Sequence, residues 1–204
     1  TRINMILNPL ESVDINGYPG WHASKDWGNP DLSKSGPYMK VTDKKGKGKF
    51  LAYGSKLTYG VREGRRYVVA LDYSHGAHVD PLVEFSFYNA AGAKIGKSTQ
   101  FELPRAKGSD PLRYVSPAVQ APDACVAMRM KVGGHNNEKT GTFVKVKQIV
   151  LCREGEDTSP FDGNSGADYF WMGAQRESAS VYHPPRSVSI TSGRGSLPAA
   201  AAAT

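Results

Sequence analysis

The sequence predicts an all-β protein, and two observations support this prediction. The first is alternation: apolar and polar residues take turns in residues 83–88 and 126–132, which is the pattern of strands with one buried face. The second is the number of turn residues: 22 Gly and 13 Pro separate short runs, and no segment shows the 3.6-residue period of a helix. Many short strands separated by turns predict a sandwich or a barrel of strands.

Nine segments are expected to form strands, because β-branched and aromatic residues concentrate in them. They are residues 38–42, 50–53, 57–61, 67–73, 83–88, 99–103, 113–118, 126–132 and 143–151. In the last of these the apolar phase slips at Lys147 and Gln148, which predicts a bulge. Turns are expected at the lysine-rich residues 44–49, as a hairpin, and at Gly133-Gly134 with the polar residues that follow. The expected core residues are Val69, Leu71, Val83, Phe85, Phe87, Val126, Met128, Met130, Val144 and Ile149.

The chain is basic, with a formal net charge of +7. A basic balance favours nucleic acid, an anionic surface or an acidic partner. Residues 44–49 form the one concentrated cluster, expected to be a solvated turn, with contact to phosphate-rich cell-wall polymers as the alternative. Aromatic RNA-binding signatures are absent, so no nucleic-acid partner is expected. No apolar run approaches the ~20 residues of a membrane span, and residues 1–5 lack a signal-peptide core.

Three patterns that could indicate chemistry are expected to be structural. Gly96-Lys97-Ser98 resembles part of a phosphate loop, but strand-like residues follow it, so the tip of a hairpin is expected. His75, His78 and Asp80 could ligate zinc or calcium, but a fourth ligand is missing and a plain loop is favoured. No nucleophile elbow, zinc-protease motif or carboxylate pair is recognisable, so no enzyme activity is expected.

The chain has two cysteines, Cys125 and Cys152. Two are too few for a disulfide scaffold, so buried free thiols are expected. The two residues lie near the start and the end of two successive expected strands. They could approach each other if these strands formed one antiparallel hairpin.

Short motifs near both ends of the chain resemble a known family. One group follows the last expected strand, and the other opens the domain. The matching residues are Pro160-Phe161-Asp162-Gly163-Asn164, Tyr169-Phe170-Trp171-Met172-Gly173 and Ser178-Ala179-Ser180-Val181 at one end, and Asn8-Pro9-Leu10-Glu11 with Gly20-Trp21 at the other. Together they resemble minor tail proteins of tailed phages that infect actinobacteria, in which a jelly-roll domain like a carbohydrate-binding module ends in the C-terminal motif.

The resemblance implies an antiparallel jelly-roll β-sandwich over residues 1–154, an aromatic Gly-rich anchor segment over 155–181 and an extended C-terminal arm over 182–204. It implies a structural virion protein, namely a minor tail or baseplate (tail-tip) component made in the host cytoplasm. Its partners would be other virion proteins and copies of itself. Two alternatives stay open: a carbohydrate-binding module that attaches the particle to host cell-wall glycan, and a capsid decoration protein. No cofactor is expected.

The resemblance also implies where a structural calcium would lie. In the family, the Glu of the opening motif, here Glu11, meets an acidic pair on the last strand. This chain has Lys147 and Gln148 at the pair. We therefore expect no calcium, and a lysine facing Glu11 in its place.

Aromatic residues supply the remaining candidates. Sugar rings stack on exposed aromatic faces, and the candidates for such contact are Trp27, Tyr38, Tyr73 and Tyr88, whereas Trp21 is expected in the core. Phe161, Tyr169 and Trp171 are expected to anchor the chain where it leaves the sandwich. Residues 182–204 are expected to dock on neighbouring chains, because Pro184-Pro185 favours an extended path and residues 187–191 alternate as an added edge strand does.

Overall fold

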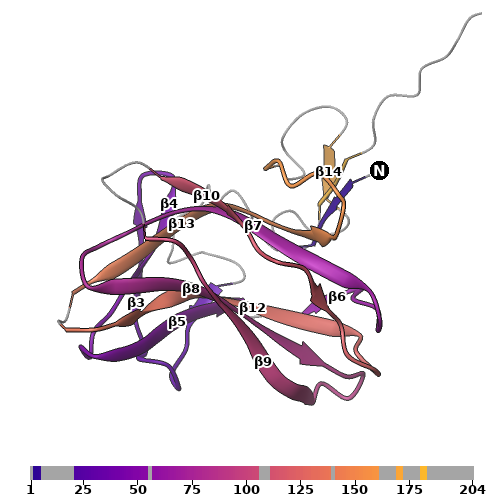
Figure 1. The fold of residues 1–204 in the computed structure, drawn as a ribbon, viewed down its shortest axis with the longest axis horizontal. Coiled ribbons are helices and arrows are strands. Elements are labelled where there is room, and N and C mark those ends of the chain that lie inside the picture. The colour runs from indigo at the N-terminus through magenta and orange to yellow at the C-terminus, as the bar shows by residue number, and fades with distance from the viewer. Residues whose placement is uncertain are drawn as a thin grey trace, which may run out of the picture.

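The computed structural model describes residues 2–5, 21–54, 57–105, 111–138, 141–160, 169–171 and 180–182. The strands in these ranges form two six-stranded sheets and one three-stranded sheet. Every pairing between neighbouring strands is antiparallel. The two large sheets form the layers of a sandwich, and the small sheet lies beside one end of it (Figure 1). The all-β antiparallel sandwich predicted from the sequence is confirmed.

We name the two large sheets after their central strands. The β12 sheet has the order β2 (Trp21–Ala23), β5 (Gly48–Gly54), β12 (Ala127–Asn136), β8 (Val79–Tyr88) and β9 (Lys94–Glu102), with β6 (Thr58–Tyr59) also paired to β12. The β13 sheet has the order β10 (Leu112–Val115), β7 (Arg66–His75), β13 (Phe143–Arg153), β4 (Tyr38–Thr42) and β3 (Asp31–Ser35), with β11 (Val119–Gln120) paired to β7.

The core between the sheets is built from alternate residues of both layers. Nine of the ten expected core residues are buried, so the predicted register is confirmed. The exception is Val126, which is half-buried because it lies one residue before β12 begins. Its N–H still bonds to the carbonyl oxygen of Tyr88, at 3.0 Å. Burying each large apolar side chain contributes roughly 1.5–3 kcal/mol, so this shared core holds the two sheets together.

Two connections cross between the sheets where hairpins were predicted or considered. β4 lies in the β13 sheet and β5 in the β12 sheet, so the lysine-rich residues 44–47 bridge the layers and the predicted hairpin is wrong. β12 and β13 also lie in opposing sheets, and no hairpin brings Cys125 to Cys152. Both cysteines are buried and free, as expected. Local turn chemistry does not specify which sheet the next strand joins, so sequence patterns could not reveal these crossings.

Gly133 and Gly134 lie inside β12, and the turn predicted there is wrong. A Cβ at position 133 would stand 2.0 Å from the carbonyl oxygen of Phe50 on β5. At position 134 it would stand 2.4 Å from a methyl group of Val79 on β8. The two glycines therefore mark a close approach of the neighbouring strands.

The bulge predicted in β13 is confirmed. The register between β13 and β7 shifts between Lys147 and Val150. Gln148 at the shift has a left-handed φ of 52°, and the extra residue lets Ile149 point into the core, where it is fully buried.

The small sheet joins segments from near the two ends of the chain. Its order is β1 (Arg2–Asn4), β15 (Ser180–Tyr182) and β14 (Tyr169–Trp171). The N–H of Met5 bonds to the carbonyl oxygen of Leu151 at 2.8 Å, which ties β1 to the sandwich. Glu11, Phe161 and residues 183–204 lie outside the described residues. In the described part of the chain, no helix is long and apolar enough to cross a membrane.

Candidate functional site

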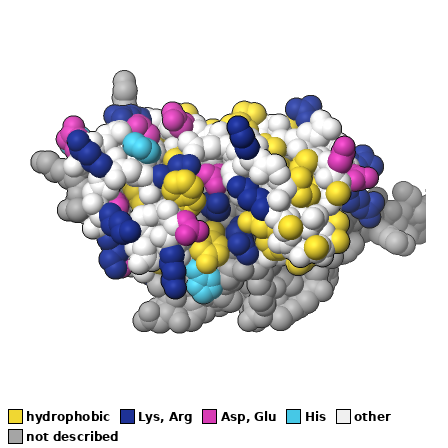
Figure 2. Space-filling model, turned by 90° about the horizontal axis from the view of Figure 1, so that it is seen from below, with side chains coloured by type: hydrophobic (Ala, Val, Ile, Leu, Met, Phe, Trp, Pro, Cys, Tyr) yellow, Lys and Arg dark blue, Asp and Glu magenta, His cyan; other side chains and the backbone are white. Residues whose placement is uncertain are grey.

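An open depression lies on the outer face of the β12 sheet, the face turned away from the core. We name it the groove, and its volume is about 520 Å³. Its lining residues are Ser24, Lys25, Asp26, Trp27, Tyr53, Tyr88, Lys94, Arg129 and Lys131. Figure 2 views this side of the molecule, where Lys and Arg side chains surround hydrophobic ones and acidic side chains are scattered between them. The volume lies within the range of roughly 300–1,000 Å³ that small-ligand sites occupy.

Strand alternation places the floor of the groove. On β12, Arg129 and Lys131 alternate with core residues and therefore point outward. Tyr53 on β5 and Tyr88 on β8 likewise point to the outer face. Lys131 pairs with Tyr53 across the β12–β5 ladder, so the basic and aromatic side chains lie next to each other.

A tight turn after β2 presents Trp27 at the rim. The N–H groups of Trp27 and Asn29 both bond to the carbonyl oxygen of Ser24, and the N–H of Leu51 on β5 bonds to the carbonyl oxygen of Trp27, at 3.1 Å. Gly28 has a φ of 73°, and a Cβ there would stand 2.9 Å from the Cβ of Phe50. This turn therefore needs glycine for two reasons, conformation and space. The result is a rigid wall on which Trp27 remains 39% exposed.

A buried carboxylate organises the basic side chains below this wall. Glu84 is 4% exposed and accepts hydrogen bonds from Lys131 Nζ at 2.7 Å and from Lys49 Nζ at 3.1 Å. Burial by itself raises the pKa of Glu84, but the hydrogen bonds and charges of Lys131 and Lys49 outweigh it, so the pKa is lowered. The ammonium of Lys49 in turn lies 4.6 Å from the centre of the Trp27 ring. A chain of contacts thus leads from the buried acid to the exposed indole.

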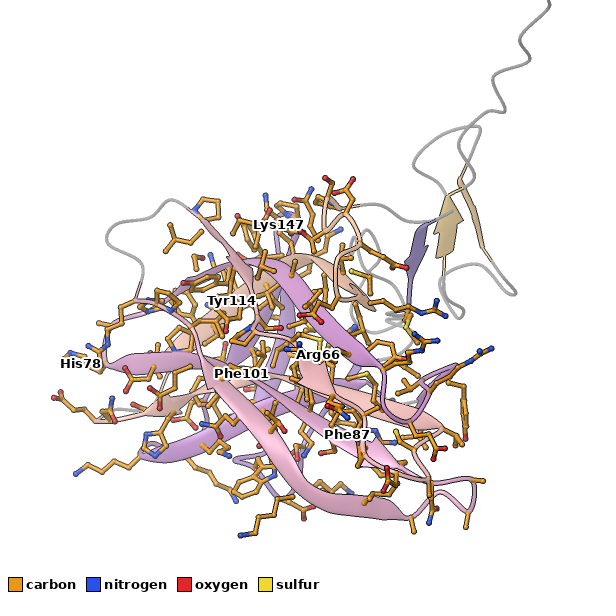
Figure 3. All side chains as sticks on the ribbon, turned by 45° about the vertical axis from the view of Figure 1, so that its right-hand side comes forward. Arg66, His78, Phe87, Phe101, Tyr114 and Lys147 are labelled. Atoms are coloured by element: carbon orange, nitrogen blue, oxygen red, sulfur yellow. The ribbon has the colours of Figure 1, made fainter. Side chains whose placement is uncertain are left out.

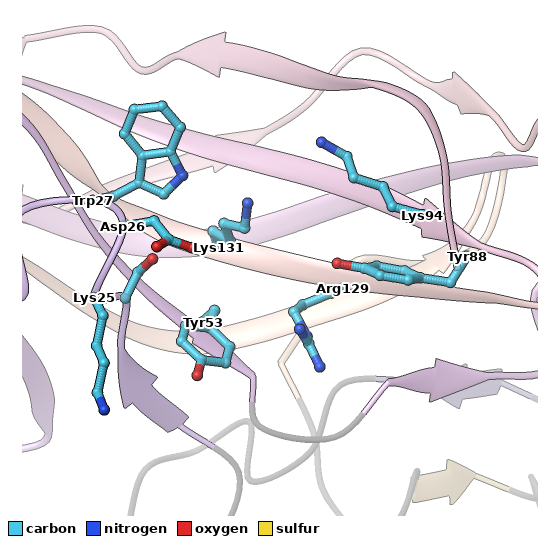
Figure 4. Close-up of a pocket in the computed structure, with 9 residues that line it drawn as sticks. Lys25, Asp26, Trp27, Tyr53, Tyr88, Lys94, Arg129 and Lys131 are labelled. Carbon is cyan, nitrogen blue, oxygen red and sulfur yellow. The ribbon is translucent and has the colours of Figure 1, made fainter. Parts of the chain in front are cut away.

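Arg129 lies at the centre of the groove between two tyrosines. Its guanidinium carbon is 5.1 Å from the centre of the Tyr53 ring and 5.4 Å from that of Tyr88, and cation–π attraction favours both contacts. Figure 4 shows Trp27 and Tyr88 at opposite ends of the groove, with Lys94 above Tyr88 and the Tyr88 hydroxyl directed along the groove. The site therefore offers one exposed indole, two phenols and a set of cations.

Two of the four aromatic residues predicted for glycan contact lie in this groove. They are Trp27 and Tyr88, which lie far apart in the sequence but line the same groove. Tyr38 lies on the outer face of the β13 sheet, where the Lys147 ammonium covers its ring at 4.8 Å. Tyr73 is 1% exposed and its hydroxyl donates to the carbonyl oxygen of Pro104. Because Tyr73 faces the core from β7, its ring is inaccessible to a ligand. The prediction that it contacts a glycan is therefore wrong.

Sequence reasoning missed Tyr53, Arg129 and Lys131. Tyr53 was assigned to a strand, but nothing in its own sequence showed that its face would meet that of Tyr88. Arg129 and Lys131 were recognised as the polar phase of an alternating strand. These outward-facing residues could have indicated the site, because two cations on the outer face of a central strand place positive charge at the middle of a sheet.

The metal candidates do not converge in the described structure. His75 Nδ1 bonds to the carbonyl oxygen of Gly76 at 2.8 Å, and His78 lies 3.1 Å from a Glu138 carboxylate oxygen. Asp80 pairs with Arg105 and accepts from Asn137 at 2.8 Å. Among the described residues, no group of three or more His, Cys, Asp or Glu side chains is arranged to hold a metal ion. Figure 3 shows His78 at one end of the sandwich and Lys147 on the β13 sheet.

Two further predictions concern the partner of Lys147 and the phosphate-loop pattern. Glu11 lies outside the described residues, so the expected pairing of Lys147 with Glu11 stays a prediction. The segment from Gly96 to Ser98 lies within β9, after the turn of the β8–β9 hairpin rather than at its tip. The Ser98 hydroxyl contacts that of Ser86 at 2.9 Å. A strand in this position has no helix N-terminus to hold phosphate.

No protein-family model matches the sequence, and no match was found among curated proteins. Similar solved structures exist. A Bacteriophage CBA120 tailspike protein matches with a TM-score of 0.55 and 12% identity, over 74% of this chain and 21% of that one. A protein from Bacteroides thetaiotaomicron, named for sugar binding, matches with a TM-score of 0.51 and 12% identity, over 74% of this chain and 100% of that one. The fold is a jelly roll of the carbohydrate-binding-module type.

A third similar structure is larger than this chain. It is a Clostridium thermocellum endo-1,4-β-D-xylanase, solved as its CBM22-1 and GH10 modules with xylohexaose, and it matches with a TM-score of 0.53 and 11% identity over 80% of this chain. This chain covers 31% of that enzyme and 21% of the tailspike chain. At such identities the likeness establishes the jelly-roll fold alone.

Proposed function

We propose that this protein is a non-catalytic glycan-binding module that holds a sugar chain in the groove of the β12 sheet. The observation that supports this most is Trp27, an indole held rigidly at the rim and 39% exposed. Indole faces stack on the C–H faces of sugar rings, while nearby hydroxyls and cations bond to sugar hydroxyls. Tyr53, Tyr88 and Lys94 stand where such polar contacts would be made. The sugar-binding name of one similar structure agrees with this proposal.

We also propose that the protein is a component of a phage tail. The motifs that resemble minor tail proteins support it, and so does the similarity in fold to a tailspike protein. Glycan binding and a structural place in the tail are compatible, because a tail tip contacts the host surface. Mass spectrometry of purified particles tests this part, and a chain missing from the particle would contradict it.

Among the described residues, the carboxylates at the groove do not form a pair suited to glycoside hydrolysis. These carboxylates are Asp26 at the rim and Glu84 beneath the floor. Glu84 is occupied by two ammonium groups, which hold it ionised and therefore unsuited to act as a general acid.

The experiment that tests glycan binding compares two aromatic substitutions on opposite sheets. Trp27→Ala should lower the affinity for a retained polysaccharide about thirtyfold or more, because truncating an aromatic residue that dominates binding costs about 2 kcal/mol or more. Tyr38→Ala removes an aromatic ring from the β13 sheet and should leave the affinity unchanged. Affinity gel electrophoresis over a panel of neutral and acidic polysaccharides measures both. Equal retardation of the two folded variants would contradict the proposed site.

A further inference from the structure

We propose that the glycan held in the groove is an acidic one, carrying carboxylate or phosphate groups along its chain. This inference rests on the proposed function and specifies its ligand. Its basis is the charge of the groove: four cationic side chains line it, Lys25, Lys94, Arg129 and Lys131, against the single carboxylate of Asp26. Lys49 and the buried Glu84 carry opposite charges, so including this pair leaves the positive balance of the groove unchanged.

The cations differ in whether they are already paired with an acidic residue of the protein. Lys131 is bonded to Glu84. Lys25 and Lys94 are both exposed, and neither makes an ion pair with another described residue. They stand on opposite walls, Lys25 in the turn that carries Trp27 and Lys94 at the start of β9. A charged chain lying across the groove would pass both.

Arg129 adds geometry to the charge. A guanidinium presents several N–H donors in a plane and suits the paired oxygens of a carboxylate or phosphate. Tyr53 and Tyr88 hold it at 5.1 and 5.4 Å from their ring centres, so little rotamer freedom remains to be lost on binding. Arg129 makes further contacts within the protein, and we therefore place the electrostatic contribution on the whole set of cations.

A neutral glycan fits this groove less well. Covering several ammonium groups with an uncharged sugar removes water from them without supplying a counter-charge, which costs free energy. Single-stranded nucleic acid is the other polyanion that uses cations with aromatic rings, but it needs open ring faces for successive bases. Here Arg129 lies between two of the three rings, and Lys49 lies 4.6 Å from the centre of the third, the Trp27 ring, which is still 39% exposed. Of the three rings that line the groove, Trp27 therefore offers a face for one sugar ring, but the groove offers no row of faces for successive bases. The arrangement therefore favours an acidic glycan.

The test uses the full chain and polysaccharides in matched pairs. Polygalacturonate is compared with its methyl-esterified form, and phosphomannan with its dephosphorylated form, so that each pair shares a sugar backbone and differs in its charged groups. We expect tighter binding to the charged member of at least one pair, by about tenfold or more, and weakening with added NaCl because salt screens exposed charges. Binding in only one pair identifies carboxylate or phosphate as the recognised group and supports the inference.

Two charge-matched double variants locate the effect. Lys25→Gln with Lys94→Gln should weaken binding of the charged member about fivefold or more, since each rim charge contributes modestly and tenfold corresponds to 1.4 kcal/mol. Lys40→Gln with Lys147→Gln removes the same charge from the β13 sheet and should change binding by less than about twofold. Equal losses in both double variants would show diffuse attraction and overturn the inference.

The remaining outcomes separate this inference from the proposed function. Equal or tighter binding of the neutral members, still lost in Trp27→Ala, overturns the acidic ligand and leaves the glycan-binding module intact. Absence of binding to all four polysaccharides and to the wider panel overturns both. Tighter binding of a single-stranded oligonucleotide than of any polysaccharide, lost in the Lys25 and Lys94 double variant, also overturns the inference, in favour of nucleic acid.

Discussion

At the scale of single residues, the groove depends on Glu84. Its carboxylate is buried, yet it is held ionised by Lys49 and Lys131, and Lys49 in turn lies against the Trp27 ring. One buried acid thus fixes two cations and supports the exposed aromatic residue. Removing its charge would leave two partly buried ammonium groups without their acceptor, which is costly.

Glu84→Gln should lower the free energy of unfolding at pH 7 by about 1–3 kcal/mol, as expected for breaking a hydrogen-bonded buried ion pair. Because the folded-state pKa of Glu84 is lowered from its ordinary value of 4.5, its stabilising contribution is present above that pH and is lost as the pH falls through the folded-state pKa. The stability gap between wild type and variant should therefore close on acidification. Urea unfolding at a series of pH values measures this gap.

Glu102→Gln is the matched control, because Glu102 is exposed on the neighbouring strand β9. It should alter stability by less than about 0.5 kcal/mol, as is usual for surface substitutions. A gap between wild type and Glu84→Gln that stays constant down to pH 3 would show that the carboxylate is not the stabilising group.

Individual site residues were predictable only where exposure was visible in the local sequence. Trp27 was favoured because it lies in a polar stretch, and it does lie at the rim of the groove. Tyr73 was misplaced because a tyrosine fits either face of a strand, and only the packing of β7 on the opposite sheet shows that it is buried. Arg129 and Tyr53 could not be joined, because their contact depends on the pairing of β12 with β5.

At the scale of elements, the turn that carries Trp27 builds one wall of the groove. Gly28 allows it, by a left-handed φ and by the close approach to Phe50 on β5. The turn's backbone hydrogen bonds to β5 then hold Trp27 over the sheet. A substitution of Gly28 should therefore lower both the ligand affinity and the stability of the fold.

Gly28→Ala should cost more stability than Gly92→Ala, and it alone should weaken glycan binding. Both glycines have a left-handed φ, 73° and 76°, so both alanines carry a similar conformational cost of about 1–3 kcal/mol. A Cβ at position 92 meets nothing within 4 Å, whereas at position 28 it meets β5. Thermal unfolding and affinity electrophoresis of the two variants make the comparison. Equal effects on binding would show that the turn does not position Trp27.

Strand positions were largely predictable, because alternation of apolar residues reflects burial on one face. The sequence did not reveal which sheet each strand joins. The crossing from β4 to β5 and the course of β12 through Gly133 both depend on packing between distant segments. β3 was missed because its residues, Asp31 to Ser35, are mostly exposed and show little apolar alternation.

At the scale of the whole molecule, the two outer faces of the sandwich differ. On the β13 sheet the half-buried aromatic residues are covered by lysines, as Lys147 covers Tyr38 and Lys40 covers Phe143 at 4.6 Å. On the β12 sheet Lys49 also lies against an aromatic ring, that of Trp27, but the side chains there surround an open groove and Trp27 stays 39% exposed. This asymmetry is the reason why we assign ligand binding to one sheet and regard the other as a solvated surface.

The most direct measurement is an NMR titration of the isotope-labelled full chain with the polysaccharide fragment that binds best. We expect the largest shifts on the Trp27 indole N–H and on the backbone amides of Tyr53, Tyr88, Lys94 and Arg129. Amides around Tyr38 on the β13 sheet should stay unmoved. Saturable shifts confined to the β13 sheet, with the Trp27 indole unchanged, would contradict the assignment of glycan binding to the groove.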